Sequence, residues 1–438
     1  MRFSVRHIRY GILVGLFMGM VAVVSACGSN RPLPPTPTSE LSVVVFATEE
    51  PQVDPTPTEF IPADTPEPVS PPTSEPEAAT DTAVFDRSAD VNPLTGLPVS
   101  DPAILERRPF MIRLGNDPEA RPQVALTEAD VVYEELVEWW VTRFTAVYLG
   151  NDPETIAPIR SARLINQQLT TQYDAALVNS GGSDEVRWEL SQTDIVNLDE
   201  FYVPSPYFYR PNEGWQTRLA FDATLGREYL DREGLDSNVN LRGFTFSDTL
   251  DLASLPADVV GDAKEIVIPY PQLTSEARWN YDEDSGRYLR FTTDEPHMDF
   301  NGEQVSAANV VIYFADHQDT EIVEDSAGAT SVRIIVNGFG PAWLVRDGKV
   351  MKGNWETDGR ETPRFTFGDG RPMPFKPGNT WIQVVPLEYA IAIDGTSQEF
   401  EGTLPSESSA SPVDASNGEA APSVPPTLTP IGARPQGN

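Results

Sequence analysis

Two proline-rich segments confine the folded part of this 438-residue chain to its middle. Residues 28–84 hold 13 of the 41 prolines and a single arginine, and residues 401–438 hold seven prolines and a single arginine. Such segments bury too little apolar surface to offset the entropy lost on ordering. We therefore expect a disordered tether at 28–84, a disordered tail at 401–438, and a folded part at about 85–400.

The N-terminus has the layout of a lipoprotein signal peptide. Arg2, Arg6 and Arg9 precede an apolar run, and Ser25-Ala26-Cys27 follows it. The run is too short for a comfortable membrane span, which is typical of a signal sequence. We predict a signal peptide at 1–27 and lipidation of Cys27, so the protein would be extracytoplasmic and anchored to the cell membrane. The alternative is an ordinary secretory signal followed by an unrelated cysteine; as the only cysteine, Cys27 leaves no internal disulfide.

The charge of the chain restricts its partners. The formal charge is −35, and residues 85–400 alone carry 52 acidic residues against 26 Lys and Arg residues. A polyanion would be repelled, which argues against binding to nucleic acid. Anionic lipid headgroups would be repelled as well, so membrane attachment should depend on the lipid on Cys27.

The first half of the folded part mixes helices and strands. Apolar, β-branched runs predict strands, and periods near 3.6 residues predict helices. The expected strands are Phe110–Leu114, Val131–Leu136, Thr142–Leu149 and Ala175–Val178, and the expected helices are Ser161–Gln172 and Asp184–Leu190. This order suggests a layered α/β domain at 85–240.

The second half reads as a series of short strands. Alternating runs recur between turn signals such as Asn301-Gly302 and Asp347-Gly348. This pattern predicts a mostly antiparallel β domain at 241–400. The expected fold class is therefore α+β, with an α/β domain followed by a β-rich domain.

Several segments, taken in order, resemble the YerB-like bacterial lipoprotein family. They are Asn92–Gly96, Arg121–Gln123, Ala129–Glu134, Thr142–Phe144, Pro158–Arg163, Tyr173–Ala175 and Gly181–Ser183, then Tyr281-Asp282, Asn309–Val311, Gly348-Lys349, Gly353–Trp355 and Pro377–Ile382. The resemblance spans about residues 90–386 and implies a two-domain envelope lipoprotein, but no reaction. Glu138-Trp139-Trp140 departs from it, because members usually have a small, glycine-containing turn there. Residues 211–220 also lack the histidine that many members carry after an aromatic-Arg segment.

One candidate site combines arginines with the start of a helix. Arg143, Arg160 and Arg163 accompany a helix expected to begin near Ser161. Free amide groups at a helix start and guanidinium groups both bind carboxylates and phosphates. The turn Gly181-Gly182-Ser183 could add further amides. The alternative is that the arginines pair with supporting acids on the neighbouring hairpin, which are Glu134, Glu135 and Glu138.

A second candidate site is an aromatic loop. Six aromatic residues lie within residues 201–215, and prolines keep the loop from regular structure. Tyr202, Tyr207, Tyr209 and Trp215 could stack on sugar rings or grip a protein partner. The alternative is a small satellite core beneath a long loop.

Catalytic and metal motifs are weak. Ser180 and Ser183 flank two glycines, but the order of a hydrolase turn is missing and the domain has no histidine to act as base. Asp294, His297 and Asp299 are too few for a convincing metal site, so we expect neither a metal nor a cofactor. A pair among Glu134, Glu135, Glu138 and Asp174 could serve carboxylate chemistry on a glycoside.

The sequence therefore favours a surface-tethered, non-catalytic scaffold that binds an anionic small molecule or a cell-wall polymer group. Two alternatives remain open at this point. One is a carboxylate-based cell-envelope hydrolase or transferase, and the other is a protein-binding module of an envelope complex.

Overall fold

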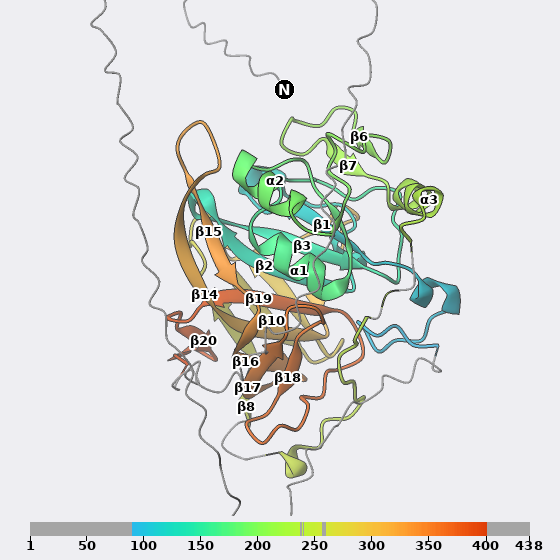
Figure 1. Ribbon diagram of the computed structural model, residues 1–438. Helices are drawn as coiled ribbons and strands as arrows, with labels where there is room; N and C mark the ends of the chain where they lie inside the picture. The colour runs from blue at the N-terminus through green and yellow to red at the C-terminus, as the bar shows by residue number, and fades with distance from the viewer. Residues whose placement is uncertain (1–89, 237–238, 240, 256–259, 401–438) are drawn as a thin grey trace, which may run out of the picture. The chain divides into compact units, whose positions relative to one another are not determined.

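The computed structural model describes residues 90–236, 239, 241–255 and 260–400 (Figure 1). The signal peptide, the lipidated Cys27, the tether and the tail that the sequence predicts lie outside these residues. Among the described residues, none of the helices has both the length and the apolar character to cross a membrane.

The largest element is a mixed sheet of twelve strands, with a main path β18-β17-β16-β14-β19-β2-β3-β1-β4-β5. The strands from the first half are β1 (Phe110–Gly115), β2 (Val131–Val137), β3 (Val141–Tyr148), β4 (Ala176–Val178) and β5 (Val196–Asn197). Those from the second half are β8 (Val260–Asp262), β14 (Asn309–Val323), β15 (Thr330–Ile335), β16 (Gly338–Arg346), β17 (Lys349–Thr357), β18 (Arg364–Thr366) and β19 (Thr380–Pro386). The strands expected at 110–114, 131–136, 142–149 and 175–178 are thus confirmed.

This sheet runs across the division expected at residue 240. β2 pairs in parallel with β19, with Val131 opposite Thr380 and Gln383 opposite Glu134. β19 in turn pairs in parallel with β14. The fold is mostly β, and the strands expected to form a separate layered α/β domain belong to the same sheet as strands of the second half. The sequence could not reveal this, because strand pairing over such a separation leaves no local pattern.

A second, seven-stranded sheet comes from the second half alone. Its members are β9 (Glu265–Ile268), β10 (Ala277–Asp282), β11 (Arg287–Thr292), β12 (Glu295–Pro296), β13 (Ser306–Ala307), β20 (Ile391–Ile393) and β21 (Thr396–Gln398). A small hairpin joins β6 (Tyr207–Tyr209) to β7 (Leu219–Phe221).

The helices are α1 (Ile165–Tyr173), α2 (Asp184–Ser191) and α3 (Ala223–Glu233). Short 3-10 turns lie at Pro102–Glu106, Pro118–Ala120, Leu126–Glu128, Glu138–Trp140 and Leu252–Ser254. The helix expected from Ser161 begins four residues later. The reason is that the Ala162 amide donates to Gly181 O at 2.9 Å and the Ser180 amide donates to Arg160 O at 3.0 Å, which holds this segment against the 180s loop.

Both faces of the large sheet are buried. On β1, Phe110, Ile112 and Leu114 join a core with Trp279 and Tyr288 of the second sheet. Met111, pointing the other way, joins a core that includes Leu169 of α1 and Leu190 of α2, and these two helices are drawn over the sheet in Figure 1. A strand buried on both faces has no need of polar alternation, which explains the continuous apolar runs in the sequence.

Candidate functional site

The structure brings the predicted arginines together around the loop before α1. We call Arg113, Arg143, Arg160 and Arg163 the arginine cluster. Arg143 lies on β3 and donates from Nη1 to Ser161 O at 3.1 Å. Arg113, on β1, reaches the same carbonyl at 3.5 Å. Ser161 therefore contributes its carbonyl oxygen to the cluster and holds the guanidinium groups, whereas the sequence suggested a free amide at a helix start.

Carboxylates neutralise the arginine cluster. Glu138 binds two of its members: Arg163 donates from Nε at 2.8 Å and Arg143 donates from Nη2 at 3.2 Å. Arg163 Nη1 also lies 3.4 Å from Glu324, a carboxylate on a side chain with no exposed surface. Arg160 has a longer ion pair, with Nη2 3.6 Å from Asp117.

The pKa values follow from this packing. Burial opposes the charge on Glu138, but the hydrogen bonds from Arg163 and the charge of Arg143 outweigh it and lower the pKa of the carboxyl to about 2. Burial and the neighbouring Arg163 lower the pKa of Arg143 to about 9. The cluster is thus a compact set of paired charges rather than a reservoir of free cations.

The other candidate acids are also paired with arginines. Glu135 binds Arg113, and both side chains are fully buried. Glu134 accepts from Arg290 of β11 at 3.0 Å and from Thr142 Oγ1 at 2.7 Å.

Asp174 ends α1 and pairs with Arg108. Each of the four acids considered for carboxylate chemistry therefore holds an arginine.

The glycine turn is organised by its neighbours. Gly181 has a φ of 69°, and a Cβ there would lie 3.0 Å from the ring of Phe201, so both the backbone and the space favour glycine. Ser183 caps α2 by accepting from the Val186 amide at 3.4 Å. Ser180 donates to Glu200 at 2.6 Å, which accounts for its hydroxyl.

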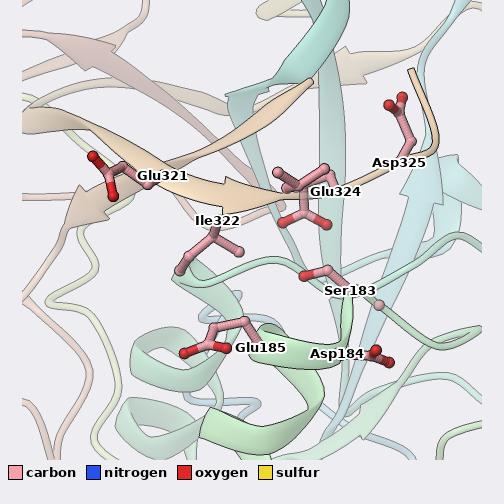
Figure 2. A pocket seen from close by; sticks show the side chains of 9 residues that line it. Ser183, Asp184, Glu185, Glu321, Ile322, Glu324 and Asp325 are labelled. Atoms are coloured by element: carbon pink, nitrogen blue, oxygen red, sulfur yellow. The ribbon is translucent and has the colours of Figure 1, made fainter. Parts of the chain in front are cut away.

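A hollow of about 590 Å³ adjoins the start of α2 (Figure 2). Five carboxylates are among its lining residues, on Asp184, Glu185, Glu321, Glu324 and Asp325. The arginine cluster contributes no lining residue, so Gly182 and Ser183 face acids here. These carboxylates would repel an anion from this hollow, and the anion site expected at the arginines and the turn 181–183 stays a prediction.

The aromatic loop is split between core and surface. Tyr207 packs on Phe221 with ring centroids 5.1 Å apart, and its hydroxyl accepts from the Asn179 amide at 3.2 Å. Tyr202, Tyr209 and Trp215 are 72%, 60% and 73% exposed. We call Phe201, Tyr202, Tyr209 and Trp215 the aromatic surface.

Arginines lie over this aromatic surface. The Arg187 guanidinium is 5.2 Å from the ring centre of Phe201 and 5.3 Å from that of Tyr202. Arg218 lies 4.6 Å above Tyr209. The Tyr209 hydroxyl donates to Glu200 at 3.3 Å, so hydrogen-bonding groups alternate with the rings.

The weak metal motif does not converge. Asp294 pairs with Arg278 at 2.7 Å. His297 is buried, with its ring nitrogens 2.8 Å from Thr292 Oγ1 and 2.8 Å from Gln123 Oε1. Asp299 accepts from the Thr127 amide at 3.0 Å. The three residues thus serve three separate contacts.

Comparison with known proteins places the chain in a family. Models for the N-terminal and C-terminal domains of a protein of unknown function (DUF3048) match residues 94–232 and 266–382, which together make up more than half of the chain. The chain is also 28% identical over 302 residues to "Putative lipoprotein YerB" of Bacillus subtilis (strain 168), covering 67% of this chain and 86% of the relative.

The chain belongs to the YerB-like family. The crystal structure of the YerB protein from Bacillus subtilis matches with a TM-score of 0.59 at 26% identity, over 69% of this chain and 99% of that one.

Segments that carry the YerB-like resemblance meet in space at a place that the sequence did not single out. The Gly378 amide donates to Thr95 O at 2.7 Å, and the Thr380 amide donates to Asp130 O at 3.1 Å. Arg287 of β11 donates to Asn379 Oδ1 at 2.6 Å beside them. Sequence reasoning did not consider Arg287, and it named Asn379 only as part of the segment Pro377–Ile382 that resembles the family. No signal in the sequence showed that the two residues meet.

Proposed function

We propose that this YerB-like protein is a lipid-anchored, non-catalytic binding protein of the cell envelope that holds a cell-wall polymer on its aromatic surface. The relative in Bacillus subtilis is described as a lipoprotein, and the pattern around Cys27 in this chain is that of a lipidation site. The anchor would place residues 90–400 outside the membrane, within reach of the wall.

The exposure of Tyr202, Tyr209 and Trp215 carries the proposal. Large aromatic side chains are costly to leave in water, and such groups in a loop are typical of a binding surface. The rings alternate with Arg187, Arg218 and Glu200, so a bound polymer would meet flat apolar faces and hydrogen-bonding groups together. A hydroxyl-rich saccharide chain offers both kinds of contact.

The pairing of the acids supports a role without catalysis. A general acid or nucleophile must be free to meet its substrate. Glu134, Glu135, Glu138 and Asp174 are each held by an arginine, which weighs against the hydrolase or transferase alternative.

The anion site expected at Arg143, Arg160, Arg163 and the turn 181–183 stays a prediction. Of these arginines, Arg160 has the longest ion pair and would have to anchor the anion.

Co-sedimentation with purified cell walls tests the proposal. We expect the wild-type protein to pellet with the walls and a Y202A/Y209A/W215A variant to remain in solution. All three positions are exposed, so the free energy of unfolding should change by only about 0.5 kcal/mol per substitution. Phe339→Ala is the matched control, because Phe339 is also exposed but lies on β16.

A protein partner is the second candidate, because tyrosine, tryptophan and arginine are also enriched at protein interfaces. Failure of the wild-type protein to bind walls would reject the polymer. Cross-linking of one envelope protein through the aromatic surface, lost in the triple variant, would establish the second candidate instead.

A further inference from the structure

Arg287 differs from the members of the arginine cluster in having only neutral partners. Its Nε donates to Ser306 Oγ at 2.9 Å, and its Nη2 donates to Ser306 O at 3.1 Å and to Asn379 Oδ1 at 2.6 Å. A guanidinium group has five N–H donors, so these bonds leave the two on Nη1. Among the described residues, none accepts a hydrogen bond from Nη1 or forms an ion pair with Arg287.

Arg287 thus carries a partly buried charge that no described carboxylate pairs with. Burial lowers the pKa of Arg287, and among the described residues no carboxylate forms an ion pair with it that would offset that effect. A partly buried charge without a counter-charge costs free energy. An anion that enters from solvent would recover that free energy.

Arg287 lines a hollow with room for such an anion. The cavity has a volume of about 400 Å³, within the range of small-molecule sites. It lies where the segments at 92–100, 127–130 and 378–379 meet. Gly378 has a φ of 136°, and a Cβ at this position would lie 2.6 Å from Ala308, so this turn at the wall of the hollow requires glycine. We call this cavity the Arg287 hollow.

We propose that the Arg287 hollow binds a small oxyanion, a phosphate or carboxylate group, through the free Nη1 edge of Arg287. Guanidinium groups match both oxyanions in geometry and keep their charge at physiological pH. The site shares no residue with the aromatic surface, so it does not depend on the polymer-binding proposal.

Two acidic residues that line the Arg287 hollow affect how tightly it would bind an anion. Asp130 is already occupied: it accepts from the Leu149 amide at 2.6 Å, the Gly150 amide at 2.9 Å and Asn92 Nδ2 at 2.9 Å. Glu128 is exposed and also lines the hollow. Its negative charge opposes an anion, so its removal should tighten binding.

Calorimetric titration of the full chain in detergent, with inorganic phosphate and separately with N-acetylalanine, tests the site. We expect saturable binding of at least one probe to the wild type, and the tighter probe identifies the oxyanion class. Arg287→Gln should weaken that binding roughly tenfold or more, since one charged anchor is lost. Arg232→Gln is the matched control for loss of positive charge on an exposed side chain.

Glu128→Gln guards against a folding artefact, because a misfolded variant does not gain affinity. It should tighten binding roughly threefold by removing a like charge. Glu295→Gln, an exposed acid that does not line the hollow, should change binding little. The assignment is overturned if neither probe binds the wild type, if R287Q binds as well as the wild type, or if E128Q binds no tighter than E295Q.

Discussion

The arginine cluster and the Arg287 hollow differ in how their arginines are paired, although both belong to one acidic chain. In the cluster, Arg113 and Arg163 are buried and each has a carboxylate partner. In the hollow, Arg287 is held by a serine and an asparagine and keeps one edge free. Paired charges at low exposure are expected of an element that fixes structure, whereas an uncompensated cation beside a cavity is expected of a binding site.

Because of this difference, we expect an anion to bind more readily at the Arg287 hollow than at the arginine cluster. The sequence directed attention to the arginines nearest a helix start, and these are the ones that the acids already satisfy. Arg287, which has free donors, lies on β11 of the second sheet. The residues next to it in the sequence did not indicate a binding site.

The largest effect should come from breaking the fully buried pair of Arg113 and Glu135. Arg113→Met leaves Glu135 buried without a counter-charge, and we expect a loss of about 3–5 kcal/mol in the free energy of unfolding. Denaturant titration measures this loss. The double variant Arg113→Met with Glu135→Leu should regain most of the stability, and a double variant as unstable as the single one would contradict a structural role for the pair.

A smaller, pH-dependent effect is expected at Glu138. Its pKa of about 2 in the folded protein lies below the ordinary value of 4.5, so its contribution is present above pH 4.5 and is lost as the pH falls toward 2. The shift corresponds to about 3 kcal/mol. The free energy of unfolding should therefore decrease less between pH 6 and pH 3 in Glu138→Gln than in the wild type. Denaturant titration at the two pH values measures both decreases. Equal declines in the two proteins would show that Glu138 is not held by the arginines.

The smallest change in stability is expected at Arg287. Arg287→Gln removes hydrogen bonds to neutral groups and also relieves an uncompensated charge, so we expect a loss of only about 1 kcal/mol. The same denaturant titration measures it. A loss as large as that of Arg113→Met would make Arg287 a structural cation and would erase the contrast between the two regions.

Much of the local structure could be predicted from the sequence. The runs at 131–136 and 142–149 are rich in β-branched and aromatic residues, and β2 and β3 form there. The start of α2 at Asp184 also follows from a capping serine one residue earlier. The start of α1 was wrong by four residues, because hydrogen bonds to a loop about 20 residues away outweigh the helical pattern at Ser161.

The candidate site was less accessible from the sequence, for a physical reason. Which charges remain free depends on which side chains meet after folding, as Arg163 with Glu324 and Arg290 with Glu134 illustrate. Exposure is also set by tertiary packing: Tyr207 and Tyr209 are two residues apart, yet one packs on Phe221 and the other reaches solvent.

The parallel pairing of β2 with β19 has a consequence during synthesis. Trp381 of β19 and Glu134 of β2 are 247 positions apart, so β2 emerges well before β19, both from the ribosome and from the export channel that the predicted signal peptide implies. Throughout that interval one edge of β2 has no neighbour and could join to another nascent chain. A chaperone that shields this edge until the last strand emerges would therefore raise the yield of this protein more than one that acts on the completed chain.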